Sequence, residues 1–150
     1  MRIDKVNYYL NIAQTVLQRS TCIRRANGAV IVSPEDFVIS TGYNGSCRGS
    51  KNCSDLNICK REELNIPSGE RYELCVSVHA EQNAIISART DLKGSTLYLV
   101  GINAKTGELN SSTFPCLLCS RLIKNAGIEK VIIRRTPTEY EVQYVKEWYL

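Results

Sequence analysis

Apolar residues recur with a helical period near the start of the chain. Between residues 3 and 19 they fall three or four positions apart, which predicts one amphipathic helix. Two β-branched runs follow at 28–33 and 37–43, and the turn-forming sequence SPED joins them. We therefore expect an antiparallel hairpin after the first helix.

The second half of the chain alternates between helical and extended patterns. The helical segments are 79–90, 116–127 and 137–149, and the extended segments are 95–101 and 129–135. Residues 102–113 between them read as a loop or a small hairpin. Because a strand, a helix and a second strand in succession favour a parallel pair with a crossover helix, the pattern predicts a layered domain. We expect a three-layer α/β/α fold around a mixed sheet of about five strands.

Residues 44–75 form a long polar insertion between these two halves. The insertion is rich in Gly, Ser and Asn, holds four of the seven cysteines and predicts a short helix near residues 60–65. Loops of this length are uncommon unless they are functional or held in place, for example by a metal ion. Since no composition shift marks a second domain, we expect residues 1–150 to form a single domain.

Composition narrows the class of protein without deciding its function. Of the 150 residues, 43% are hydrophobic and 23% are charged, as in ordinary globular domains. No apolar run near the N-terminus has the length of a signal peptide or a membrane helix, so we expect a soluble, cytoplasmic protein without a membrane partner. The net charge of +4 suits an anionic small molecule as well as a nucleic acid. The pair Arg134–Arg135 is expected to be solvated surface.

Seven cysteines are many for a chain without a secretion signal. An odd number in this setting argues against a disulfide framework and favours metal binding or catalysis. Cys116 and Cys119 are spaced so that both sulfur atoms can face one ion at the start of a helix. Taken alone, this pair fits a catalytic metal site, a structural metal site or a redox dithiol equally well.

His79, the single histidine of the chain, favours the catalytic metal site. One His and two Cys ligands leave a tetrahedral zinc ion one open position, which is typical of catalytic zinc. Glu81 follows in the first turn of the same helix and can move protons beside the metal. The combination H-x-E…P-C-x-x-C is the signature of zinc-dependent deaminases. It predicts that His79, Cys116 and Cys119 bind zinc and that Glu81 is the proton shuttle.

Longer segments resemble the deoxycytidylate deaminase family, a branch of the cytidine deaminase superfamily. The similar segments are STCIRRANGAVIV, ISTGYNGSCRGSKNCSD, GERYELCVSVHAEQNAI and PCLLCSRLIKNAGIEKVII. The resemblance implies a cytidine deaminase-like fold and the zinc-dependent hydrolysis of dCMP to dUMP and ammonia, which supplies thymidylate synthesis. It also implies a homo-oligomer, often a hexamer, with dCTP as activator and dTTP as inhibitor of many members.

The resemblance extends to residues that would contact the nucleotide. Asn44 matches an asparagine that contacts the deoxyribose hydroxyl, although an Asn-Gly pair fits a plain turn equally well. Ala80 would offer backbone atoms to the pyrimidine. Arg24 is the first candidate for the phosphate and Arg25 the second, because guanidinium matches phosphate bidentately. The alternative for both arginines is an exposed pair or an oligomer contact.

A second, structural zinc ion is also implied by the resemblance. Its candidate ligands are Cys22, Cys53, Cys59 and Cys75. A closed four-thiolate site would fix the insertion and offset the entropy lost on ordering it. The alternative is that these cysteines are small buried side chains, since free cysteine is often buried. In either case Cys47 is left free.

Other functions fit parts of the same pattern. A deaminase of the superfamily could act on free cytidine or deoxycytidine, on a tRNA adenosine or on a riboflavin-pathway pyrimidine. An RNA-acting member should have a basic or aromatic surface around its pocket, and the mixed C-terminal sequence lacks one, so no nucleic-acid partner is expected. Free-nucleoside deaminases usually hold zinc through three cysteines. A non-catalytic zinc-stabilised module would have no use for Glu81, and a redox dithiol would not retain metal.

Overall fold

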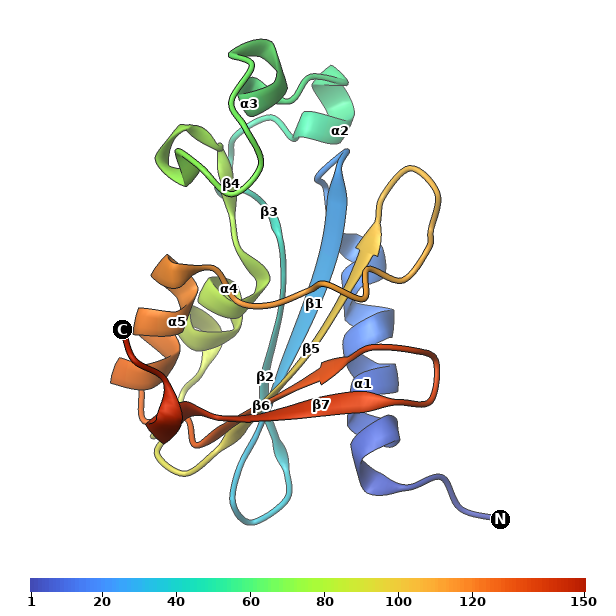
Figure 1. Cartoon of the computed structure of the whole chain (residues 1–150), viewed down its shortest axis with the longest axis vertical. Helices are drawn as coiled ribbons and strands as arrows, with labels where there is room; N and C mark the ends of the chain where they lie inside the picture. Colours follow the sequence, from blue (N-terminus) through green and yellow to red (C-terminus); the bar gives the residue numbers. More distant parts are fainter.

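A five-stranded mixed sheet forms the centre of the computed structural model, which describes residues 1–150 (Figure 1). The strand order is β2-β1-β5-β6-β7. These strands are Arg25–Val32 (β1), Val38–Tyr43 (β2), Thr96–Asn103 (β5), Lys130–Arg134 (β6) and Tyr140–Tyr144 (β7). β5 and β6 are parallel, and the other neighbouring strands are antiparallel.

Helices cover both faces of the sheet (Figure 1). They are α1 (Lys5–Val16), continued by the 3-10 turn η1 (Leu17–Arg19), α4 (Ala80–Ser87) and α5 (Leu117–Asn125). Because successive residues of a strand point to opposite faces, β1 supplies Val30 to the core under α1 and Ile31 to the core under α4 and α5. The predicted three-layer α/β/α fold with a mixed sheet is therefore confirmed. None of the helices has the length and apolar character needed to cross a bilayer.

The local predictions for most of the chain are also confirmed. The N-terminal helix and the β1–β2 hairpin are present, and SPED forms the turn at 33–36. α5 crosses over between the parallel strands β5 and β6, as the alternating pattern predicts. An isolated bridge between Ile102 and Leu109 makes residues 102–113 a small hairpin.

The prediction of a helix over residues 137–149 is wrong. Residues 140–144 form the edge strand β7, and only Val145–Glu147 (η3) make a 3-10 turn. The free edge of β6 offers backbone partners along the whole of β7, and Tyr and Val favour extended structure. In this strand Glu141 and Gln143 lie on the face towards α5 and are half-buried. Pairing with a strand that is close in space therefore outweighs a weak helical period.

Arg134 is another correction, because it is buried and not solvated. Only 4% of the residue is exposed. Its guanidinium donates from Nη1 to Oε1 of Gln14 and from Nη2 to Oδ1 of Asn11, both at 2.8 Å. Both acceptors belong to α1, so this arginine joins the first helix to the end of β6.

The polar insertion folds into a small lobe beyond one end of the sheet (Figure 1). Its elements are β3 (Gly45–Ser46), α2 (Cys53–Leu56), α3 (Lys60–Glu63) and the 3-10 turn η2 (Tyr72–Leu74). The short helix predicted near residues 60–65 is thus confirmed. β3 pairs with β4 (Ser77–Val78), which brings both ends of the lobe together immediately before His79. The lobe is therefore attached directly to the segment that carries the histidine.

Gly42 on β2 determines how closely α4 approaches the sheet. A Cβ atom at this position would overlap the backbone of Ala80 and Ala84. Glycine here lets the first turns of α4 lie directly on the strand. The close contact positions the helix N-terminus at which His79 and Glu81 are found.

Candidate metal centre and active site

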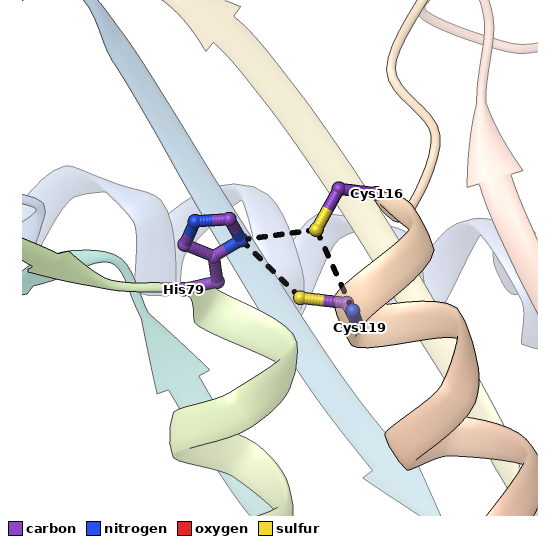
Figure 2. A group of neighbouring side chains, drawn as sticks. All are labelled: His79, Cys116 and Cys119. Carbon is purple, nitrogen blue, oxygen red and sulfur yellow. Dashed lines mark hydrogen bonds between the residues drawn. The ribbon is translucent and has the colours of Figure 1, made fainter. Parts of the chain in front are cut away.

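His79 and the Cys116–Cys119 pair meet at the N-termini of two neighbouring helices. His79 is the N-cap of α4 and Cys116 is the N-cap of α5. The three ligand atoms lie within 4.8 Å of one another. Nδ1 of His79 is 3.2 Å from Sγ of Cys119 and 3.6 Å from Sγ of Cys116, although 37 positions separate His79 from Cys116 (Figure 2). The fold thus brings together the two halves of the deaminase signature.

Local hydrogen bonds fix the two helix starts. The backbone N–H of His79 donates to Oε1 of Gln82 at 2.8 Å, and that of Cys119 donates to Sγ of Cys116 at 3.4 Å. The free N–H groups and the dipole at a helix N-terminus favour negative charge, so both helices favour thiolate at this point.

The three side chains share protons in a way that suits a metal ion. The hydrogen bond from the Cys119 thiol, followed by the contact with His79, lowers the pKa of Cys116 to about 4. The same hydrogen bond raises the pKa of Cys119, and the one with Cys116 raises the pKa of His79. A divalent ion would displace these protons, because metal ligands bind in their deprotonated forms. Two sulfurs and one imidazole fit tetrahedral zinc and leave one position open.

Glu81 lies one residue inside α4, next to the same group. It is 4% exposed, and burial raises the pKa of its carboxyl. The side chain lines the pocket that also contains His79 and Cys116. A carboxyl that faces a pocket away from bulk solvent can accept and return a proton there. Ala80, predicted to offer backbone atoms to a ligand, is fully buried and does not line this pocket.

The pocket also contains both arginines predicted to bind phosphate. Nε of Arg24 forms an ion pair with Oε1 of Glu62 at 3.0 Å, and 29% of the Arg24 side chain is exposed. Arg25, at the start of β1, is exposed. The structure therefore brings both residues to the pocket. Arg24 already has an acidic partner, whereas Arg25 is held by no ion pair.

Asn44 lines the pocket with most of its amide already engaged. Its Oδ1 accepts hydrogen bonds from Oγ of Ser20 (2.6 Å) and the backbone N–H of Asn27 (2.9 Å). Its Nδ2 donates to the carbonyl oxygen of Arg25 at 2.8 Å. Asn44 connects β2 to β3 and is not part of a two-residue hairpin turn. One N–H of the amide is left for a sugar hydroxyl.

The four cysteines predicted for a second zinc lie in one region, but they are not as close together as His79, Cys116 and Cys119. Cys22, Cys59 and Cys75 line the pocket described above. Cys53 is buried, and the N–H of the next residue, Ser54, donates to the carbonyl oxygen of Thr21, the residue before Cys22, at 3.0 Å. The four residues do not form a cluster of the kind seen for His79 and its partners. The leftover Cys47 is exposed and forms no disulfide.

Several residues of this pocket are not predicted from the sequence. They are Asn27, Arg61, Ser68, Tyr72, Ser77 and Phe114. The Tyr72 ring meets the His79 ring edge-on, with 5.6 Å between their centres. Phe114 could have been noticed as an aromatic residue next to the Pro-Cys motif. The residues of the insertion carry no comparable signal, because its polar sequence does not indicate which side chains fold back over the metal ligands.

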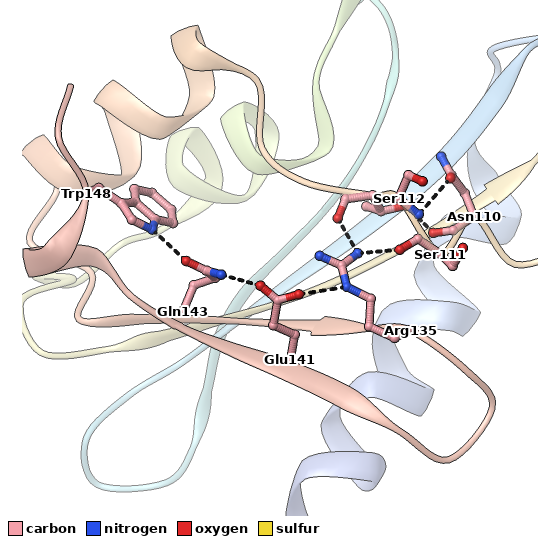
Figure 3. Close-up of polar contacts among 8 residues, drawn as sticks. Asn110, Ser111, Ser112, Arg135, Glu141, Gln143 and Trp148 are labelled. Carbon is pink, nitrogen blue, oxygen red and sulfur yellow. Dashed lines mark hydrogen bonds and ion pairs between the residues drawn. The ribbon is translucent and has the colours of Figure 1, made fainter.

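The segment before Cys116 is anchored by Arg135 (Figure 3). Nη1 of Arg135 donates to the carbonyl oxygens of Ser111 (2.8 Å) and Thr113 (2.6 Å), and its Nε pairs with Glu141 at 3.1 Å. Gln143 donates to the same carboxylate and accepts from Nε1 of Trp148. The edge strand β7 therefore fixes the loop that leads into the metal-binding helix.

Comparison with known proteins agrees with this geometry. Residues 3–135 match the family described as cytidine and deoxycytidylate deaminase zinc-binding region. The chain belongs to this family. The predicted family and its zinc-binding region are thus confirmed.

Relatives within the family differ in length. The deoxycytidylate deaminase of Mycobacterium phage D29 is 40% identical over 136 residues, which cover 87% of this chain and 94% of the phage protein. The deoxycytidylate deaminase of Schizosaccharomyces pombe is 33% identical over 126 residues, or 84% of this chain. The chain spans only 35% of that longer yeast protein.

Solved structures of the superfamily have the same fold. The dCMP deaminase of cyanophage S-TIM5, in complex with dCMP and dUMP, aligns with a TM-score of 0.62 at 26% identity, covering 89% of this chain and 83% of that one. A cytidine deaminase from Mycobacterium tuberculosis aligns with a TM-score of 0.54 over 97% of this chain and 94% of that one. At 16% identity the second likeness concerns the fold alone. The expected cytidine deaminase-like fold is confirmed.

Proposed function

We propose that this family member deaminates dCMP hydrolytically to dUMP and ammonia in the cytoplasm, and so supplies thymidylate synthesis. The observation that carries the proposal is the convergence of His79, Cys116 and Cys119 beside buried Glu81 in a pocket that contains arginines. The 40% identity to the phage D29 deoxycytidylate deaminase supports the substrate. The likeness to the cyanophage dCMP deaminase, whose structure contains dCMP and dUMP, supports it further.

Each residue of the cluster has a role in this proposal. His79, Cys116 and Cys119 hold the ion through one nitrogen and two sulfurs. Zinc, when bound, lowers the pKa of water to about 7 and so supplies a nucleophile at neutral pH. The Glu81 carboxylate accepts a proton, transfers it to the pyrimidine nitrogen next to the amino group, and assists the departure of ammonia. Because Glu81 is 4% exposed, bulk water does not compete for that proton.

The arginines of the pocket favour a nucleotide over a free nucleoside. Arg24 and Arg25 would provide cationic donors for a phosphate, and the free N–H of Asn44 would contact the sugar. A backbone role for Ala80 is not part of the proposal, because that residue lies outside the pocket lining.

Turnover of a panel of cytosine compounds tests the substrate. The change in ultraviolet absorbance on deamination is followed with dCMP, deoxycytidine and dCTP on zinc-loaded protein. We expect kcat/KM for dCMP to exceed that for deoxycytidine by at least about tenfold, since a charge-assisted phosphate contact contributes about 1.5–3 kcal/mol. Equal turnover of deoxycytidine and dCMP would contradict a phosphate-dependent substrate choice.

We also propose a second, structural zinc ion held by Cys22, Cys53, Cys59 and Cys75. Support comes from the shared pocket lining of three of these residues and from the Ser54–Thr21 hydrogen bond beside the fourth. Four thiolates would close the coordination sphere and leave the ion without an open position. Such a site would join the start of β1 to both ends of the insertion.

Metal content measured on purified protein tests the second site. We expect two zinc ions per chain, one ion in Cys53→Ser and two in Cys47→Ser, which is the matched control because Cys47 is exposed. Loss of the structural ion should also lower the thermal midpoint, since metal binding is coupled to folding. A single zinc ion in the wild type, unchanged in Cys53→Ser, would rule out the second site.

Regulation and assembly are part of the same proposal. We propose a homo-oligomer, with a hexamer favoured by the family resemblance, and dCTP and dTTP as effectors. Residues 41–43 and 45–50 line a second pocket together with Arg19, and Arg48 is one of them. Two guanidinium groups there would suit the phosphates of an effector. Repeating the turnover assay with dCTP and dTTP as additives tests the regulation.

A further inference from the structure

Arg61, in α3 of the insertion, is a buried cation without an acidic partner. Only 6% of the residue is exposed, and none of the ion pairs in the structure includes it. Its Nη2 donates to the carbonyl oxygens of Pro67 (2.7 Å) and Glu70 (2.9 Å), and its Nε is buried without a hydrogen-bond partner. Because a buried charge that lacks a counter-charge has lost its hydration without compensation, such groups are normally paired. An anionic ligand would supply the missing partner.

The other buried arginine differs in this respect. Arg134 also has an unpartnered Nε, but oxygen atoms of Asn7, Asn11 and Gln14 surround its two Nη atoms at 2.8–3.4 Å. These acceptors all belong to α1, so Arg134 is used to hold the helix on the sheet. Arg61 has only two carbonyl partners, and it faces a pocket instead of a helix.

Arg61 lines the same pocket as His79 and Glu81. One aromatic ring separates its guanidinium from the histidine. Cζ of Arg61 lies 4.7 Å from the centre of the Tyr72 ring, and that ring contacts His79 edge-on at 5.6 Å. In a nucleotide the sugar ring similarly separates the phosphate from the base. A base that faces the metal ligands would therefore direct its phosphate towards the arginine side of the pocket.

Arg61 is also better prepared for an anion than the two arginines expected from the sequence. Arg24 already pairs with Glu62, so a phosphate would compete with a carboxylate there. Arg25 is exposed and held by no ion pair, so its side chain would lose rotamer freedom on binding. The two backbone carbonyls fix the Arg61 guanidinium before a ligand arrives, which reduces that cost.

We propose that Arg61 is a specificity-determining contact for the 5′-phosphate of the substrate. The inference rests on the proposed function, because a nucleotide substrate is what brings a phosphate into this pocket. Because Nη2 already donates to two carbonyl oxygens, a phosphate oxygen would accept from the remaining N–H groups of the guanidinium, whose positive charge strengthens such bonds. Arg61 thereby distinguishes dCMP from deoxycytidine, and the polar insertion becomes part of the substrate site.

Comparing dCMP with deoxycytidine in variants of Arg61 isolates the contact with the phosphate. In Arg61→Met we expect kcat/KM for dCMP to fall about 10- to 100-fold, mainly through KM, while that for deoxycytidine changes less than about threefold. Arg71→Met is the matched control, because Arg71 lies in the same insertion, is exposed and pairs with Glu73. It should leave the values for both substrates unchanged.

Equal losses on both substrates would overturn the inference and make Arg61 a structural residue of the insertion. If Arg61→Met does not fold, Arg61→Lys provides the comparison, since it keeps the charge and removes the planar guanidinium that the two carbonyls hold in place. We expect it to lose dCMP turnover several-fold and to retain deoxycytidine turnover, and any other pattern contradicts the proposal. Wild-type protein that turns over deoxycytidine but not dCMP would instead refute the proposed substrate, and this inference with it.

Discussion

Replacement of Glu81 by glutamine should abolish dCMP turnover while zinc stays bound. Glutamine keeps the size and the buried position of the side chain but can neither accept nor return the proton. We expect kcat to fall at least about 10³-fold, because general acid–base catalysis contributes about 10²–10⁴ and this residue serves more than one transfer. The decrease is measured by ultraviolet assay, and zinc is measured on the same sample by atomic absorption.

The matched control for this change is Glu63→Gln. Glu63 is an exposed residue in the first turn of α3, so the same substitution there should leave turnover and zinc content unaltered. Activity of Glu81→Gln near that of the wild type would show that another group moves the proton. Loss of zinc together with activity would indicate that Glu81 holds the metal instead of shuttling protons.

Replacement of Cys116 by alanine should remove the catalytic zinc ion and, with it, all measurable turnover. Two ligands would be left, and Cys116 is the thiol whose pKa is lowered to about 4 by its contacts with Cys119 and His79. We expect one zinc ion fewer per chain and a loss of activity of at least about 10³-fold. Metal analysis and the turnover assay on one preparation measure both effects.

Zinc readdition provides the control for Cys116→Ala. Wild-type protein stripped with a chelator should regain its activity when zinc is restored, whereas the variant should not. If Cys116→Ala kept the zinc content and the turnover of the wild type, the assignment of the metal ligands would be wrong.

The catalytic cluster could be predicted from the sequence because its parts are local. Cys116 and Cys119 are one helical turn apart, and His79 and Glu81 share the first turn of another helix. Spacing of this kind fixes which side chains can share one ion before the tertiary structure is known. What the sequence did not contain is the contact between the two helices, which depends on the packing of both against the same face of the sheet.

The edge strand and the insertion were harder to predict because non-local contacts determine them. β7 exists through its pairing with β6, and the weak helical period of the segment 137–149 gave no hint of that partner. The consequences reach the active site, since Glu141 and Arg135 anchor the loop before Cys116 (Figure 3). Because residues 137–149 were predicted as a helix, the contacts that hold the loop before Cys116 could not be predicted either.

Arg61 and Tyr72 illustrate the same limit within the insertion. Pairing of β3 with β4 folds the insertion back over the pocket, and a polar stretch without period does not indicate which residues then face inward. The resemblance to the family points to Asn44, but it does not predict the hydrogen bonds that Asn44 makes within the protein. Its amide mainly fixes the start of β1, which leaves one N–H for a ligand.

The most direct test of the central claim is turnover of dCMP by zinc-loaded protein in ¹⁸O-labelled water. Hydrolytic deamination replaces the amino group by oxygen from water, so the product should be dUMP with one ¹⁸O atom in its pyrimidine ring carbonyl and one ammonia released per dUMP. Mass spectrometry and an ammonia assay on the same reaction measure both products. Recovery of unchanged dCMP from protein shown to contain zinc would contradict the account.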